Sequence, residues 1–221
     1  MSPPTLESLY IFAVFMLGDR KAAFEAVCST TERAPSDSIR QLAQLVADLV
    51  AAERPAKVDH FGELDDVLRL DTTVPVDLDH PLVQGDARRL GVLLAELQRT
   101  CLMSTLRGIP TARRAVFILR HILGLSLKTC VEILGTSGIA VRALESRARK
   151  TIEEYLFPRC EHPHRLNPCH CAGRLGGALE KRFITWPTHH DFGDMRPPGP
   201  YPGVEALFAA LPRVRLPILH P

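Results

Sequence analysis

Apolar residues recur at helical spacing along most of this chain, and the clearest pattern lies between residues 126 and 152. In its first part they stand three and four positions apart, at Leu127, Cys130, Val131 and Leu134. This spacing puts them on one face of a helix. Ser126 precedes the run and can cap its N-terminus, and Gly135 follows it where a left-handed residue ends a helix. The pattern therefore predicts a short helix and a sharp turn.

A second helix is expected to begin at Ser137, directly after that turn. Its apolar stripe consists of Val141, Leu144, Ala148 and Ile152, and its basic residues lie mostly off this stripe, at Arg142, Arg147, Arg149 and Lys150. Such a pair of helices is the outline of a helix-turn-helix, in which phosphates hold the second helix by charge and its N-terminal side chains reach base edges. The alternative is a solvated basic helix whose cations complement the helix dipole.

The remaining pattern predicts an all-α protein with two small helical domains. The expected divisions are an N-terminal helical domain at 1–51, an acidic linker at 52–85, the helix-turn-helix domain at 86–157, a Cys/His cluster at 158–175 and a proline-rich tail at 176–221. The linker holds three prolines and scattered carboxylates without a nucleophile or glycine-rich loop, so a solvated segment is favoured over a catalytic site. Within the tail, residues 204–211 predict a short amphipathic helix.

Composition narrows the function further. The net charge is only +2, so affinity for nucleic acid has to come from local clustering, as in the segment from Arg142 to Lys150. The apolar run IFAVFML is too short to span a bilayer, and no secretory signal is evident. We therefore expect a cytoplasmic, non-enzymatic protein without membrane contact.

The run IPTARRAVFILRHILGLSLKTCVEILGTSGIAVRALESRARKTIEEYL resembles the C-terminal promoter-binding domain of bacterial sigma factors of the extracytoplasmic-function type. The resemblance implies that this segment reads the upstream promoter element and contacts core RNA polymerase. The DNA-binding residues that it implies are Arg113, Arg114, Ser137, Arg142, Ser146, Arg147 and Arg149, and the nearby Lys128 and Lys150 are further candidates. One departure is Leu144-Glu145, where the family commonly has Arg-Leu. Glu145 is therefore expected near the DNA face, where its carboxylate would weaken binding or accept from cytosine N4.

The N-terminus more weakly resembles the sigma domain that grips polymerase and melts the promoter, through LESLYIFAVFMLGDRKAAFEAVCSTTERAP. No Trp, Phe or Tyr occurs between Ser29 and His60. Melting requires surfaces that catch flipped bases, and aromatic stacking contributes about 1 to 3 kcal/mol per base. The segment Ile39 to Val50 is accordingly interpreted as an amphipathic core helix rather than a DNA-melting one.

The segment FPRCEHPHRLNPCHCAGRL gathers thiols and imidazoles directly after the basic helix. Such ligands suit zinc or monovalent copper, and the expected metal ligands are Cys160, His164, Cys169 and Cys171. A redox-active thiol pair and unligated thiols remain open alternatives, whereas a disulfide is disfavoured in a reducing compartment. The three isolated cysteines, Cys28, Cys101 and Cys130, are interpreted as small core residues.

Some extracytoplasmic-function sigma-like proteins carry a similar Cys…Asn-Pro-Cys-x-Cys extension, and the resemblance implies a metal or thiol sensor beside the DNA-reading helix. Further along, His189, His190 and Asp191 could extend a metal site, but loop residues are favoured there. The sequence thus predicts a sigma-like regulator with promoter DNA, core RNA polymerase and an anti-sigma factor as candidate partners. The alternative is a sigma mimic that titrates an anti-sigma factor, or modulates a genuine sigma factor, without initiating transcription.

Overall fold

The computed structural model describes residues 4–34, 37–52, 62, 65–66, 76, 79–185, 201–211 and 214. Within these residues every regular element is a helix, and the only β-type pairing is an isolated bridge between Cys160 and Cys169. The all-α class is therefore confirmed. The chain forms two compact units, one assigned Met1–Val58, Leu106–Ile152 and Val214–Pro221 and the other Asp59–Thr105 and Glu153–Arg213.

The first unit joins the N-terminal helices to the helix-turn-helix. Its elements are α1 (Leu6–Leu17), α2 (Arg20–Arg33), α3 (Ser38–Ala52), α6 (Thr111–Phe117), the π-helical η1 (Ile118–Ile122), α7 (Leu127–Leu134) and α8 (Gly138–Leu156) as far as Ile152. Local signals explain the first turns: the Thr5 side chain accepts from the backbone N–H of Ser8, and that of Asp19 accepts from Ala22. Gly18 ends α1 in the left-handed region, at φ 73°.

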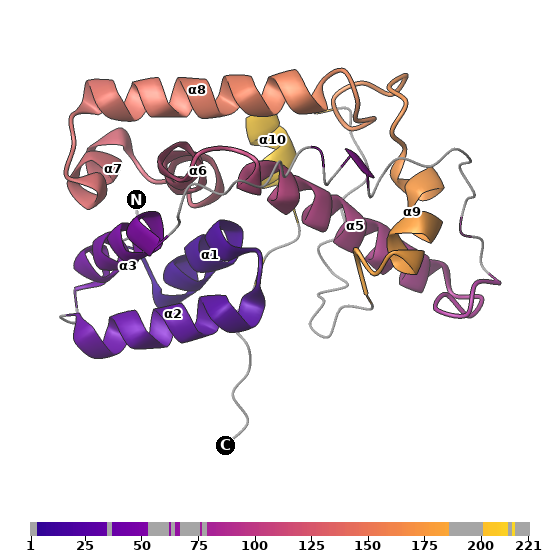
Figure 1. The fold of residues 1–221 in the computed structure, drawn as a ribbon, viewed down its shortest axis with the longest axis horizontal. Coiled ribbons are helices and arrows are strands. Elements are labelled where there is room, and N and C mark those ends of the chain that lie inside the picture. The colour runs from indigo at the N-terminus through magenta and orange to yellow at the C-terminus, as the bar shows by residue number, and fades with distance from the viewer. Residues whose placement is uncertain are drawn as a thin grey trace. The chain divides into compact units, whose positions relative to one another are not determined.

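Buried apolar side chains form the core between the helices of this unit. Helix α1 buries most of its length, and α3 buries Leu42, Leu45 and Val46. Helix α3 packs against α6 and α7, and α1 packs against α6 and η1 (Figure 1). Residues 1–51 were expected to form a domain separate from the helix-turn-helix, but the two share this core instead. The reason is that α3 supplies an apolar stripe that α7 and α6 cover, which agrees with its interpretation as an amphipathic core helix.

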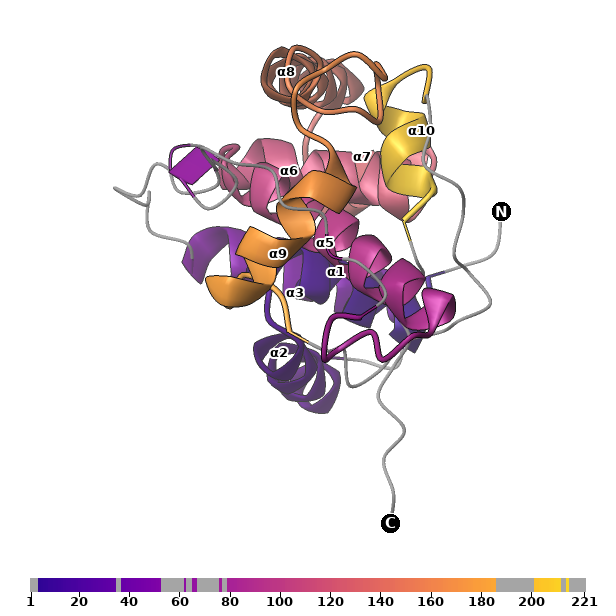
Figure 2. The ribbon, with the colours of Figure 1, turned by 90° about the vertical axis from the view of Figure 1, so that its right-hand side faces the viewer.

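The second unit is built on α5 (Ala87–Arg107, as far as Thr105), with α9 (Cys171–Glu180) beside it in both views (Figures 1 and 2). Its core contains Leu93 and Leu97 from α5 with Leu175 and Ala178 from α9. Helix α10 (Val204–Ala209) also belongs to this unit and buries Val204, Leu207 and Phe208, so the expected amphipathic helix in the tail is present.

The acidic linker predicted at 52–85 is not simply solvated where the structure describes it. Val83 is completely buried in the core of the second unit, and Asp65 accepts a 2.7 Å hydrogen bond from the Tyr155 hydroxyl. The segment 86–105, expected with the helix-turn-helix, is likewise grouped with the second unit. None of the helices that the structure describes is long and apolar enough to cross a membrane.

Candidate DNA-binding helix and thiol-lined cavity

Three local features build the helix-turn-helix. The hydroxyl of Ser126 accepts from the backbone N–H of Thr129 at 3.1 Å and begins α7. Gly135 ends α7 with φ 58°, a backbone conformation that a residue with a Cβ adopts only with strain. The hydroxyl of Ser137 then accepts from Ala140 at 3.2 Å at the start of α8. Both caps and the glycine turn stand where the sequence predicts them.

Helix α8 has two contrasting faces. Val141, Ala148 and Ile152 are completely buried. Of the expected DNA-binding residues, those on or beside this helix-turn-helix are exposed, namely Lys128, Ser137, Arg142, Ser146, Arg147, Arg149 and Lys150. Leu144, expected in the apolar stripe, is only half-buried. The arrangement leaves a basic surface directed away from the core, which is the geometry that major-groove docking needs.

Glu145 does not lie on this basic surface. Its Oε1 is 3.3 Å from Nε of Arg120 and 3.0 Å from Nε2 of His121, and its side chain is only 19% exposed. The expectation of a carboxylate near the DNA was therefore wrong. Because Glu145 lies four residues after Val141, helical geometry directs it to the inner side of α8, where η1 supplies the basic partners. The inward ion cluster removes a source of repulsion toward phosphate.

Arg114 also departs from expectation. It is 2% exposed, and its guanidinium donates to the carbonyl oxygens of Met16 at 2.8 Å, Arg107 at 3.2 Å and Ile109 at 3.3 Å. A side chain held in this way cannot reach phosphates, so Arg114 joins α1 to α6 inside the first unit. Its neighbour Arg113 is half-exposed and remains a candidate phosphate contact.

Residues 99–152 match the family model described as Sigma-70, region 4. This segment is similar to sigma-70 region 4. The match begins in the last turns of α5 and includes α6, η1, α7 and the basic part of α8, so it covers the whole helix-turn-helix. It supports the resemblance to extracytoplasmic-function sigma factors and indicates interaction with promoter DNA and RNA polymerase. Searches of curated proteins and of solved structures found no match.

The chain that follows the region 4 segment contributes to a cavity of about 370 Å³ inside the second unit. Four thiols line it: Cys101 from α5, and Cys160, Cys169 and Cys171 from the segment after α8. Sequence reasoning assigned Cys101 to a core because it has no cysteine near it in the chain. Only the packing of α5 and α9 around one core brings it to the other three, so spacing gave no signal for it.

Hydrogen bonds hold this cysteine segment in shape. The Asn167 side-chain amide donates to the carbonyl oxygens of Phe157 at 2.5 Å and Cys160 at 2.8 Å. The backbone N–H of Cys169 donates to Arg159, and that of Glu161 donates back to Cys169. The Asn167 side chain thus holds the Asn-Pro-Cys-x-Cys loop against the backbone at Phe157 and Cys160.

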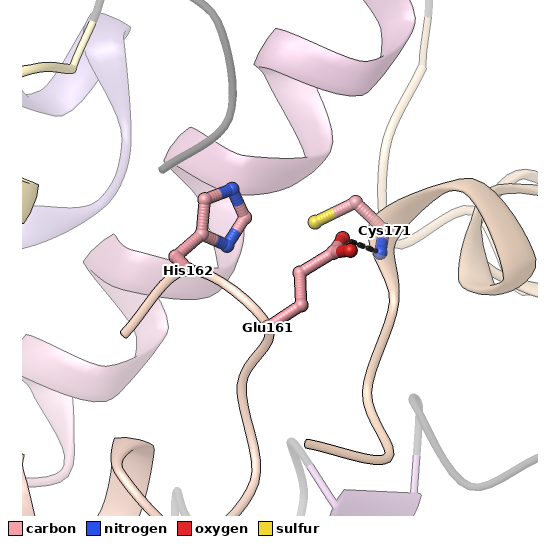
Figure 3. A group of neighbouring side chains, drawn as sticks. All are labelled: Glu161, His162 and Cys171. Carbon is pink, nitrogen blue, oxygen red and sulfur yellow. Dashed lines mark hydrogen bonds between the residues drawn. The ribbon is translucent and has the colours of Figure 1, made fainter. Parts of the chain in front are cut away.

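A compact donor group lies within the segment (Figure 3). One ligand atom each from Glu161, His162 and Cys171 can be chosen so that all three lie within 4.8 Å of one another. The Glu161 carboxylate accepts from the backbone N–H of Cys171 at 2.5 Å, and the Cys160 sulfur is 3.1 Å from Nδ1 of His162. Imidazole, thiolate and carboxylate are all zinc ligands, and thiolates also bind monovalent copper, so these donors fit such a metal.

The donor group shares only Cys171 with the four expected ligands, because Cys160 and Cys169 lie along the same cavity but outside the group. His164 is exposed and stands outside the group, whereas His162 is 4% exposed and belongs to it. The turn between Cys160 and Asn167 directs His162 inward, where its ring stacks at 6.3 Å from that of Tyr201. Glu161 was not among the expected ligands either. The trio His189, His190 and Asp191 lies outside the described residues.

Burial sets the protonation of these groups. It raises the pKa of Cys160 to about 12 and raises the pKa values of Cys101, Cys169 and Cys171 as well. It also lowers the pKa of His162, against the opposing charge of Glu161. At neutral pH the cluster therefore consists of thiols and a neutral imidazole. Thiols that stay protonated are poor nucleophiles, and they bind a metal only when the metal displaces the proton.

Proposed function

We propose that this protein is a sigma-like transcription regulator that docks the basic face of α8 on promoter DNA and binds RNA polymerase. The observation that carries the proposal is the contrast between the two faces of α8 within the region 4 segment. Arg142 and Arg147 are exposed on a helix whose opposite side is fully buried. Phosphate contacts of this kind fix a recognition helix in register, while its N-terminal turn faces the bases.

We further propose that the Cys/His segment binds zinc or monovalent copper and that this binding regulates the protein. Support comes from the clustering of Glu161, His162 and Cys171, and from the additional thiols along the same cavity. When bound, the metal would hold thiolates that burial otherwise keeps protonated. Because this segment directly follows α8 in the chain, the order of the C-terminal end of α8 would then depend on metal.

A second candidate function is regulation without initiation, in which the protein modulates a genuine sigma factor or titrates an anti-sigma factor. The observation that favours it is the packing of α1 and α3 against α6, and of α3 against α7, within one compact unit. A polymerase-gripping, DNA-melting domain would be expected to act apart from region 4, and the stretch from Ser29 to His60 carries no aromatic side chain for flipped bases.

In vitro transcription separates the two functions. Purified core polymerase and the full chain are combined on a supercoiled library of promoters, with zinc, with copper and with a chelator. Specific transcripts that disappear with Arg142→Ala combined with Arg147→Ala support an initiating sigma-like role. Leu166→Ala, which changes an exposed residue outside α8, is the control. If the folded protein yields no transcript under any condition but competes with a known sigma factor, the second function is correct.

A further inference from the structure

A row of exposed residues runs along the outer face of α8. Ile139, Ala143, Ser146 and Lys150 are separated by four, three and four positions, so they follow one line along the helix. All four are exposed, and they lie opposite the buried Val141 and Ala148. The row begins at the second residue of α8 and forms the middle of the basic face.

Ile139 is unusual in this row because it is large, apolar and 82% exposed. Gly138, the residue before Ile139, faces α7. A Cβ atom added to Gly138 would lie 3.7 Å from the Leu127 side chain and 3.8 Å from the Val131 side chain. One residue further along the helix, Ile139 points away from α7. It therefore covers nothing in its own unit, and its exposure follows from its place on the helix.

The chemistry around Ile139 identifies what it can contact. Ala143 beside it is small and lets a partner approach closely, and Arg142 and Arg147 flank the row with positive charge. An apolar centre between two cationic margins matches a DNA major groove, where phosphates border the base edges. The one apolar group on those edges is the 5-methyl group of thymine.

We propose that Ile139 is a specificity-determining residue that packs against a thymine 5-methyl group in the upstream promoter element. The inference rests on the proposed docking of α8 on DNA and adds to it the identity of one base contact. Because the N-terminal residues of a recognition helix reach base edges, the second residue of α8 is well placed for this contact. The arginines then supply affinity for any duplex, and Ile139 supplies preference among duplexes.

The test uses duplexes chosen by the full chain from a random library. In the best duplex each thymine is replaced in turn by uracil, which removes only the methyl group, and the dissociation constant is measured by fluorescence anisotropy. Wild type should bind about fourfold more weakly at one uracil position, the effect of one buried methyl group. The Ile139→Ala variant should bind the thymine duplex more weakly and show no further loss at that position.

Leu166→Ala removes a side chain that is 87% exposed outside α8 and should leave the uracil scan unchanged. Equal sensitivity of wild type and Ile139→Ala at every position overturns the inference, and so does a wild type insensitive to all replacements. In both cases the selected duplex still binds, so the proposed function stands. Selection of no duplex at all overturns the proposed function together with the inference.

Discussion

Replacing Arg114 by Met should destabilise the protein without removing a DNA contact. The methionine side chain preserves much of the apolar volume and deletes the guanidinium that joins α1 to α6. Three carbonyl oxygens would lose their donor, those of Met16, Arg107 and Ile109. The substitution therefore separates a structural arginine from the DNA-binding role that the sequence suggested for it.

The geometry sets the expected magnitude. The 2.8 Å bond to Met16 is a strong charge-assisted one, and such bonds contribute about 1.5 to 3 kcal/mol. The bonds to Arg107 and Ile109, at 3.2 and 3.3 Å, add about 1 kcal/mol together. Relief of the cost of burying the guanidinium offsets part of this sum. We expect the free energy of unfolding to fall by about 2 kcal/mol, a large share of a typical domain's stability.

Urea denaturation, monitored by circular dichroism, measures the change in the free energy of unfolding. An unchanged slope of that free energy against urea concentration shows that the variant exposes the same surface on unfolding. Arg113→Ala is the matched control: its half-exposed side chain should change stability by no more than about 0.5 kcal/mol while weakening DNA binding. An Arg114→Met protein as stable as wild type, but with impaired DNA affinity, would refute the reasoning and restore Arg114 to the DNA surface.

Three further predictions concern the inward ion cluster and the thiols. Glu145→Ala should lower the thermal midpoint because it leaves Arg120 half-buried without its carboxylate partner, and it should leave DNA affinity nearly unchanged; a marked change in affinity would contradict the inward placement. Cys169→Ser with Cys171→Ser should abolish zinc content measured by mass spectrometry, whereas equal metal in both proteins would argue against the site. Burial raises the pKa of Cys160 to about 12, so its alkylation at pH 7 should be slow without metal and should quicken about tenfold per pH unit; a fast, pH-independent rate would contradict this protonation state.

Local rules predicted the helix-turn-helix well. Ser126, Gly135 and Ser137 act through their own backbone and the next few residues, so their roles can be read from sequence order alone. The buried face of α8 followed from residue spacing in the same way. Exposure of Arg142 and Arg147 is a consequence of that spacing too, because the opposite side of the helix has to face outward.

Long-range packing decided what the sequence did not predict. Arg114 stands next to Arg113 and carries the same charge, yet the end of α1, nearly one hundred residues earlier in the chain, supplies its partner. Cys101 has no motif around it and joins the other thiols only because α5 and α9 share a core. His162 and His164 are equivalent by spacing, and the turn that follows Cys160 selects His162. The outcomes for Arg114 and Cys101 thus depend on tertiary contacts between segments far apart in sequence, and the outcome for His162 depends on the shape of one turn.

The salt dependence of DNA binding tests the central claim most directly. The full chain and the Arg142→Ala variant are titrated with a selected duplex over a range of potassium chloride concentrations. If α8 docks through its exposed cations, log affinity should fall linearly with log salt with a slope of about −3 to −4, and the variant should lose about one unit of that slope. A salt-independent affinity, or identical slopes for both proteins, would contradict the docking of α8 on DNA.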